Sequence, residues 1–397
     1  MLLLAIAPVA CLSPMDPDKV ALASVRVAVG ENGLNTDTIQ VRGTMRVQAR
    51  AIAREGYDAG VTSFRYSSSN TAVASIDSLG TVRGVSPGTV TITVTTPSGV
   101  SGTATVVVVP TTIAYTIPVG GVPGALAFSP DYTRGYVTVG RDSLVILDAL
   151  AFLRLATVDL GLTSAGVAAT AQNVYVTHPD NDSVSVVSAA TKQLVGRIYI
   201  AGSPRGIAAR GSRAWITATD AEQVIALDDD GSTNAVDVEG KPMDIAVSGD
   251  GLRLFVTTQV AQGWKLLVLD AATLHTAGSV SLPSAPGEIA ANADGSTAYV
   301  TLPQSSRLQV VNADANAVLS LGASLAGPPA VSGVALRTLG VPYLVLSGTG
   351  AMIVDATAFA PGDVITGAGG GRVAIRPDGL FAFLASPSLR SIQVIGL

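Results

Sequence analysis

Four charged residues occupy related positions in this 397-residue sequence and are its best candidates for chemistry. They are Arg205, Asp244, Glu288 and Arg372, and each stands two or three positions before an Ala that recurs along the chain. Asp244 and Glu288 are the only acidic residues at these positions, and carboxylates are the groups that acid–base chemistry needs most often after histidine. Structural salt bridges with Arg205 and Arg372 are the competing interpretation. The choice depends on the elements that position these side chains.

The recurring Ala follows an apolar residue seven times, at intervals of 38 to 45 residues. The seven pairs are Leu126-Ala127, Val167-Ala168, Ile207-Ala208, Ile245-Ala246, Ile289-Ala290, Val334-Ala335 and Val373-Ala374. A period near forty is the length of four short strands with their turns, which is typical of propeller blades. We therefore expect one blade per repeat, with the small Ala on the innermost strand, where the sheets converge.

An aromatic residue follows each Ala by seven to nine positions, and in three repeats it opens the sequence Tyr-Val-Thr. These aromatics are Tyr136, Tyr175, Trp215, Phe255, Tyr299, Tyr343 and Phe383, and we expect them between neighbouring blades. The seventh repeat ends before a fourth strand, whereas a segment resembling that strand, at 114–124, precedes the first repeat. We expect this N-terminal strand to complete the last blade, because an open ring would leave two sheet edges unpaired.

The recurring "YVT", together with "ADG" at 293–295 and "PDG" at 377–379, resembles the YVTN family of seven-bladed β-propellers over about residues 113–397. The resemblance implies an exported protein with a binding or scaffolding role.

The blade order argues against metal and triad chemistry. In each predicted four-stranded blade, the loop that leads into the first strand and the loop that joins the second strand to the third lie at the same end of the central channel. His178 belongs to that end and His275 to the other, so the two histidines cannot share a metal or a substrate. Asp180 and Asp182 lack the Gly and Glu of a calcium loop. We therefore predict no metal and no cofactor.

Three further segments have structural explanations. The "DDDG" at 228–231 predicts a turn, and "GAGGGR" at 367–372 lacks the Lys-Ser/Thr of a phosphate-binding loop. Trp264 stands beside a loop at the same end as the four charged residues, so it is either packed in the core or an exposed contact.

The region before the repeats contains eight short strand-like segments, which favour a β-sandwich. They are 25–29, 38–41, 45–52, 61–66, 73–76, 81–85, 90–95 and 104–109. The "SSSN" at 67–70 and the "GTVTI" at 88–92 resemble the bacterial immunoglobulin-like domain, group 2. This resemblance implies an extracytoplasmic spacer or adhesion module over residues 25–110.

The first eleven residues, "MLLLAIAPVAC", combine an apolar stretch of signal-peptide length with the only cysteine of the chain. Cys11 resembles the acylated cysteine of a bacterial lipoprotein signal, and a plain secretory signal with an incidental thiol is the alternative. Residues 12–24 are expected to be a linker. The net charge of −5 and the lack of a long basic run argue against nucleic acid and anionic membrane surfaces as partners.

The sequence thus predicts an all-β protein: signal segment 1–11, linker 12–24, immunoglobulin-like β-sandwich 25–110, and seven-bladed β-propeller 113–397 closed by its N-terminal strand. We expect an exported, envelope-anchored binding or scaffold protein, with a lactonase- or lyase-like propeller enzyme as the alternative. The expected partner is an extracytoplasmic protein, a glycan or a small polar ligand. Arg205, Asp244, Glu288, Arg372 and Trp264 are its candidate contacts, and a lipid anchor is the only expected attachment to a membrane.

Overall fold

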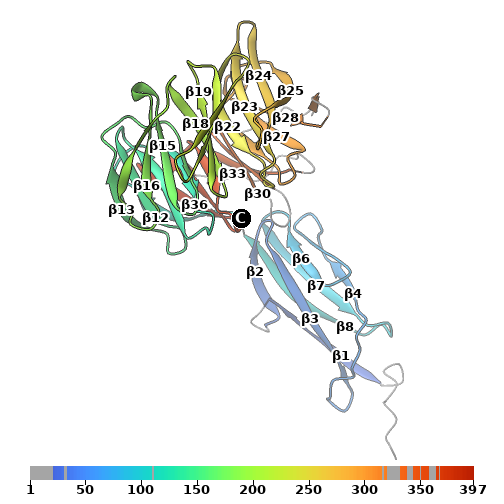
Figure 1. Cartoon of the computed structure of the whole chain (residues 1–397). Coiled ribbons are helices and arrows are strands. Elements are labelled where there is room, and N and C mark those ends of the chain that lie inside the picture. The colour runs from blue at the N-terminus through green and yellow to red at the C-terminus, as the bar shows by residue number, and fades with distance from the viewer. Residues whose placement is uncertain are drawn as a thin grey trace, which may run out of the picture. The chain divides into compact units, whose positions relative to one another are not determined.

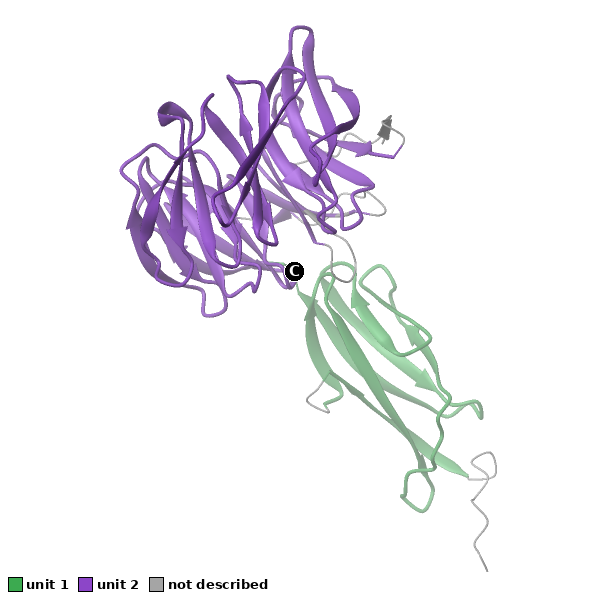
Figure 2. Cartoon of the chain, in the orientation of Figure 1, with its two compact units in different colours: residues 1–111 green, residues 112–397 purple. Residues whose placement is uncertain are grey.

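The computed structural model describes residues 21–30, 34–109, 111–314, 317–319, 331–337, 343–348, 350–356, 364–365 and 367–397. The chain divides into two compact units, Met1–Thr111 and Thr112–Leu397 (Figure 2). Both units are built almost wholly of strands (Figure 1). The helical pieces among these residues are two single 3-10 turns, η2 (Pro179–Asn181) and η3 (Pro303–Ser305). No described segment forms a helix long and apolar enough to cross a membrane.

Two four-stranded sheets make up the first unit. One has the order β1 (Leu22–Val29), β3 (Thr44–Ala53), β6 (Thr81–Gly84) and β5 (Ala74–Ile76). The other has the order β2 (Thr36–Gln40), β8 (Ser101–Val109), β7 (Gly88–Thr95) and β4 (Arg65–Ser68). The first strand begins at Leu22, so it includes the last three residues of the segment that we expected to be a linker.

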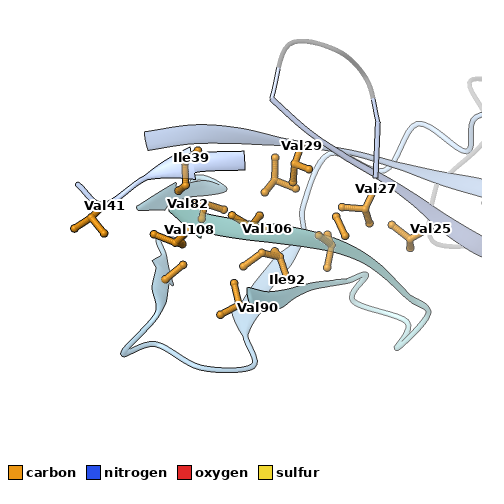
Figure 3. Packing of buried hydrophobic residues seen from close by; sticks show 14 residues of the cluster. Val25, Val27, Val29, Ile39, Val41, Val82, Val90, Ile92, Val106 and Val108 are labelled. Carbon is orange, nitrogen blue, oxygen red and sulfur yellow. The ribbon is translucent and has the colours of Figure 1, made fainter. Parts of the chain in front are cut away.

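Alternating apolar residues hold these two sheets together (Figure 3). Val25, Val27 and Val29 of β1 are buried, and the residues between them are more exposed. They share a core cluster with Val90 and Ile92 of β7. Branched side chains suit a strand that is buried on one face, and each buried Val or Ile contributes about 1.5–3 kcal/mol. The first unit is therefore an immunoglobulin-like sandwich around one core.

In the second unit the described strands form antiparallel four-stranded sheets, taken here in chain order. Sheet 1 contains β10 (Pro123–Phe128), β11 (Arg134–Val139), β12 (Ser143–Asp148) and β13 (Leu153–Asp159). Sheet 2 contains β14 (Val167–Ala169), β15 (Asn173–His178), β16 (Ser183–Ser188) and β17 (Leu194–Tyr199). Sheet 3 contains β18 (Pro204–Arg210), β19 (Arg213–Ala218), β20 (Gln223–Asp228) and β21 (Thr233–Asp237). Sheet 4 contains β22 (Lys241–Val247), β23 (Arg253–Val260), β24 (Gly263–Asp270) and β25 (Thr276–Leu282).

The remaining sheets follow the same pattern. Sheet 5 contains β26 (Ile289–Ala291), β27 (Thr297–Leu302), β28 (Arg307–Asn312) and β29 (Ala317–Leu319). Sheet 6 contains β30 (Gly333–Arg337), β31 (Tyr343–Ser347), β32 (Ala351–Asp355) and β33 (Val364–Ile365). Sheet 7 contains β34 (Val373–Ile375), β35 (Phe381–Ser386), β36 (Ser391–Gly396) and β9 (Ile113–Pro118). Each numbered sheet thus begins with the strand that carries the recurring Ala.

Neighbouring sheets pack on one another through clusters of buried apolar side chains. Tyr136 of sheet 1, for example, belongs to the same cluster as Val174 of sheet 2. The contact between sheet 7 and sheet 1, called here the closing seam, is made in the same way, and Phe383 and Val137 share a cluster there. The second unit is therefore a closed ring of sheets, which is the β-propeller fold.

The aromatic residue of the second strand fills the space between sheets in six repeats, as expected. These six residues, each at most 6% exposed, are Tyr136, Tyr175, Trp215, Phe255, Tyr299 and Phe383. The side chain of Tyr343 lies outside the part that the structure describes, so the expectation for it stays a prediction; in the backbone register Ala335 pairs with Val345. Val345 follows Ala335 by ten residues, so a longer connection moves the equivalent position beyond the spacing of seven to nine that the other repeats share.

The N-terminal strand of the propeller completes sheet 7, as the sequence predicts. Strand β9 pairs antiparallel with β36, and Ile117 lies opposite Ile392. Ile117 is only 2% exposed, so β9 contributes to the core as well as to the hydrogen-bond ladder. The outer edge of β36 is thereby paired by a strand that precedes it by some 270 residues.

Aromatic and charged side chains reinforce the closing seam. The Phe152 ring stacks on Tyr115 of β9, with 4.3 Å between ring centroids, and lies 4.9 Å from Phe381. Arg376 lies over the Phe381 ring at 4.6 Å, and its Nη1 donates to the Ala149 carbonyl oxygen of sheet 1 at 2.6 Å. Aromatic pairs and a buried cation–π contact each stabilise the fold by about 0.5–2 kcal/mol beyond the contribution of the apolar area that they bury.

Candidate functional site

A cavity of about 760 Å³ lies where the innermost strands of the propeller converge. Residues that precede or begin the first strands of all seven numbered sheets line it. One sector of the lining contains all four charged candidates, Arg205, Asp244, Glu288 and Arg372. In the sector formed by sheets 1 and 2, the corresponding positions hold small residues, namely Gly124, Ala125, Ala165 and Gly166. The cavity is therefore strongly asymmetric in charge.

The third residue of the Tyr-Val-Thr motif positions the strands that line the cavity. In sheet 3, Thr217 Oγ1 accepts the Gly206 N–H at 2.8 Å and lies 3.2 Å from the Met243 carbonyl oxygen of sheet 4, to which it donates. Thr217 is fully buried, so water cannot replace the hydroxyl. One side chain thus ties the innermost strand of its own sheet to that of the next sheet.

Equivalent hydroxyls around the cavity make one or both of these bonds. Thr177 and Thr301 donate to the carbonyl oxygens of Arg205 and Ser332 at 2.7 and 3.1 Å, and Ser347 donates to that of Gly371. Thr138 and Thr257 accept the N–H groups of Ala125 and Asp244 at 2.8 and 3.2 Å. The equivalent residue of sheet 7 is Ala385, so the closing seam has no such hydroxyl. Sequence reasoning missed this role, although the repeated Thr was the available signal.

Close approach of neighbouring sheets explains why small residues prevail in the lining. A Cβ atom on Gly206 would lie 2.8 Å from Asp244 Cα and 2.9 Å from the Met243 carbonyl oxygen. A Cβ atom on Gly333 would lie 3.0 Å from Glu288 Oε2, so this glycine leaves the space that the carboxylate occupies. The repeat itself therefore demands small residues here, and charged side chains at the same position are departures from it.

Glu288 and Arg372 form an ion pair across sheet 6. Glu288 Oε1 lies 3.3 Å from Arg372 Nη1, and Glu288 Oε2 accepts the Val334 N–H at 3.1 Å. The Glu288 side chain is only 12% exposed, whereas that of Arg372 is 46% exposed. One of the two salt bridges that the sequence allowed is thus formed, with its carboxylate on sheet 5 and its guanidinium on sheet 7.

Burial and neighbouring charges change the pKa values of the residues in this cluster. Burial raises the pKa of Glu288 to about 7, with Arg372 opposing the rise and the charge of Asp244 adding to it. Burial also raises the pKa of Asp244, again against the effect of Arg372. For Arg372, burial acts to lower the pKa, but the two carboxylates outweigh it and the pKa is raised. The charge of the cluster therefore changes near neutral pH, mainly through Glu288.

Arg205 differs from the other three residues. It is exposed at the cavity, and its guanidinium has no ion-pair or hydrogen-bond partner within the described residues. Its own carbonyl oxygen accepts the Thr177 hydroxyl, which fixes the backbone from which the side chain extends. The side chain is thus anchored at its base and open at its charged end.

The other candidate residues lie outside this cluster. Trp264 does not line the cavity and packs, partly buried, against the core between sheets 4 and 5. His178 is fully buried between the Thr163 carbonyl oxygen at 3.0 Å and Ser185 Oγ at 2.8 Å, and burial lowers its pKa. Within the described ranges no group of three or more His, Cys, Asp or Glu could hold a metal ion. Cys11 lies outside those ranges.

Comparisons with known proteins agree with this architecture. Residues 35–108 match the family model of the bacterial Ig-like domain (group 2). Over 178 residues the chain is 26% identical to the YncE proteins of Salmonella typhi and Salmonella typhimurium, which is 42% of this chain and 50% of each relative. The chain thus spans about half the length of the curated relatives it matches.

Solved structures with similar folds are β-propellers. A chain of Kuenenia stuttgartiensis hydrazine synthase has a TM-score of 0.62 at 19% identity, over 69% of this chain and 95% of that one. The β-propeller domain of Cps50 (Swd1) from Myceliophteria thermophila has a TM-score of 0.58 at 12% identity, over 72% of this chain and 100% of the other. At such identities the likeness concerns the fold alone. This chain therefore has a β-propeller fold, and its residues 35–108 match the family model of the bacterial Ig-like domain (group 2).

Proposed function

We propose that this chain is an exported binding protein of the cell envelope, and that its propeller, of the seven-bladed YVTN type, holds a polar ligand at the channel mouth. The ligand is a small polar molecule, a glycan or a segment of an extracytoplasmic protein. The observation that carries the proposal is the cluster of Arg205, Asp244, Glu288 and Arg372 in the cavity. Their repeat positions elsewhere hold mostly small residues, so the fold does not require these charges.

Within this proposal the residues have different roles. Arg205 presents an unpaired guanidinium, whose planar fork suits a carboxylate or phosphate of the ligand. The Glu288–Arg372 pair supplies a second polar contact, whose acceptor is held in place by the Val334 N–H. The small residues of the opposite sector leave room for the uncharged part of the ligand.

A lactonase- or lyase-like enzyme is the second candidate, and the pKa of Glu288 favours it. A carboxyl group with a pKa of about 7 can act as a general acid or base at neutral pH. Turnover of a lactone or uronate substrate that is lost in Glu288→Gln would establish this activity. If the chain binds such a substrate but does not convert it, the binding role is supported instead.

The test of the binding role is a screen of the full chain against envelope glycans and extracytoplasmic proteins, followed by variants. We expect Arg205→Ala and Glu288→Ala to weaken binding about tenfold or more, because each removes a charge-assisted contact. Asp230→Ala is the matched control, since Asp230 is an exposed turn residue of the "DDDG" segment. Loss of binding in the control, with both cavity variants intact, would place the site at the other end of the channel.

Export and anchoring are part of the same proposal. We propose that the segment before Cys11 is removed and that Cys11 is acylated, because acyl chains supply membrane affinity through their buried methylene groups. Replacing Cys11 with Ser should then move the protein from the membrane fraction to the soluble fraction. Unchanged fractionation would show that the thiol is incidental.

A further inference from the structure

Arg205 and Asp244 carry opposite charges on neighbouring inner strands of the propeller, yet they do not pair with each other. Arg205 belongs to β18 and Asp244 to β22, the first strands of sheets 3 and 4. Their backbones lie close together, because a Cβ atom on Gly206 would lie 2.8 Å from Asp244 Cα. Both residues line the cavity, and within the part of the chain that the structure describes neither forms an ion pair.

The acidic side of the cavity contains more negative than positive groups. Asp244 and Glu288 share the guanidinium of Arg372, which forms its ion pair with Glu288. Burial raises the pKa of Asp244, although Arg372 and the Ile245 N–H act to lower it. When both carboxyl groups are ionised, these three side chains together have one negative charge in excess. This side of the cavity therefore attracts a cation.

Glu288 shows the effect of the same imbalance. Burial raises its pKa to about 7 and the charge of Asp244 adds to the rise, whereas Arg372 and the N–H groups of Val334 and Val373 oppose it. A protonated amine beside this carboxyl group would supply further positive charge and would lower the pKa again. Binding of a cation at this place is thus coupled to the loss of a proton.

We infer that the cavity binds a small zwitterion, a molecule with a carboxylate for Arg205 and a protonated amine for Asp244 and Glu288. The inference rests on the binding role proposed for the cavity and specifies its ligand. The guanidinium of Arg205 suits a carboxylate, to which it can donate two parallel hydrogen bonds. An ammonium group donates up to three hydrogen bonds, which carboxylate oxygens accept. The ligand thus joins two opposite charges that the fold holds side by side and leaves unpaired.

A ligand with charge of one sign fits this cavity less well. An anion can bind to Arg205, but Asp244 and Glu288 repel it wherever they are ionised. A cation can bind to the two carboxylates, but the guanidinium of Arg205 keeps its positive charge at all relevant pH values and repels it. A zwitterion avoids both repulsions, provided that its two charges have the right separation.

The test measures binding of amino acids of increasing length to the full chain by isothermal titration calorimetry. Glycine, β-alanine, γ-aminobutyrate and ε-aminocaproate place progressively more carbon atoms between carboxylate and amine. Caproate and hexylamine each lack one of the two charges. We expect one member of the amino-acid series to bind at least about tenfold more tightly than caproate and hexylamine, because it makes both charge-assisted contacts.

Substitutions assign the two charges of the ligand to their partners. Arg205→Gln should weaken binding of the best zwitterion about tenfold or more and should not weaken binding of hexylamine. Asp244→Asn should weaken the zwitterion to a similar degree and should not weaken caproate. The second substitution keeps the side-chain shape and removes a poorly compensated charge, so the fold should be retained. Arg210→Gln is the matched control, since Arg210 is exposed on the same strand as Arg205 but does not line the cavity.

Proton release is a further readout, and it reports on the amine alone. Because the amine lowers the pKa of Glu288 from about 7, binding of the zwitterion near neutral pH should release about half a proton. Titrations in buffers of different ionisation enthalpy measure this release. It should fall in Glu288→Gln, and caproate, which has no amine, should release none.

Three outcomes would overturn the inference. Caproate that binds as tightly as every zwitterion, and is lost in Arg205→Gln, would make the ligand an anion and leave the binding role intact. Hexylamine that binds as tightly, and is lost in Asp244→Asn, would make it a cation with the same consequence. If none of the zwitterions binds, the inference fails by itself, because the screen of glycans and proteins decides the binding role separately.

Discussion

Some side chains at the channel mouth stabilise the fold, and others are better explained by function. Thr217 serves the fold, because its buried hydroxyl links two sheets. Glu288 instead costs stability, because a carboxylate at a position that four other repeats fill with Gly or Ala carries a desolvation penalty, seen in its raised pKa. An ion pair whose carboxylate is buried is weak evidence for stability. We therefore attribute Glu288 to binding or chemistry, and its cost to the fold can be measured.

We predict that Glu288→Gln makes stability less dependent on pH. The pKa rises from 4.5 to about 7 on folding, so the folded state holds the proton more tightly. The stability from this group is full below pH 4.5 and is lost as the pH rises through 7, by about 3 kcal/mol. Gln cannot ionise, and its amide oxygen can still accept the Val334 N–H. Urea unfolding near pH 5 and pH 8 measures the effect, and an equal pH dependence in both proteins would contradict it.

The strands were largely predictable from the sequence, because the alternation of apolar and polar residues and the small residue of each first strand are visible in short segments. The alignment of seven repeats also placed the four charged residues at one channel mouth. The pairing within that cluster was not predictable, since Glu288 reaches Arg372 only because Gly333 leaves space on the intervening sheet. The register of sheet 6 was not predictable for a related reason: the length of one connection decides that Val345, and not the aromatic Tyr343, pairs with Ala335.

Thr217→Val tests the tie between strands of neighbouring sheets. Val has nearly the shape of Thr but leaves the Gly206 N–H and the Met243 carbonyl oxygen without the hydroxyl. We expect a loss of about 1–3 kcal/mol in the free energy of unfolding, because the Gly206 N–H is buried and the Met243 carbonyl group is partly buried. Thr217→Ser keeps the hydroxyl and should lose less, and Thr233→Val, on the exposed strand β21, should lose nothing. If Ser at position 217 is the more harmful replacement, the methyl group and not the hydroxyl matters.

Closure of the propeller joins the two ends of its sequence. Sheet 7 is complete only with β9, and the seam lacks the hydroxyl tie that Thr177, Thr217, Thr301 and Ser347 make between other neighbouring sheets. An aromatic group around Phe152, with Arg376 lying against it, packs there instead. The similarity of segment 114–124 to other fourth strands predicted that β9 pairs with β36. The aromatic contacts of the closing seam were not predictable, because closure of the ring brings their residues together from distant parts of the sequence.

Replacing residues 113–118 with a flexible Gly/Ser segment of equal length should unfold the propeller or make it oligomerise. The replacement exposes the edge of β36, and unpaired edges recruit other strands. Light scattering after size exclusion, together with thermal unfolding, measures the result. A synthetic peptide of residues 112–119 should restore the monomer. A monomer whose melting is unchanged without the peptide would refute closure by β9.

The antiparallel pairing of β9 with β36 also has a mechanical consequence. Ile113, where the chain arrives from the sandwich, lies opposite Ile395, whereas Pro118 lies opposite Ser391. Tension applied between the sandwich and Leu397, which directly follows β36, therefore loads the ladder at its Ile113 end and opens it by unzipping, one hydrogen bond at a time. Such unzipping needs less force than shearing all the bonds together. A pull between these two points would thus load the β9–β36 ladder directly, which makes the pairing of the closing strand within sheet 7 the point that yields first.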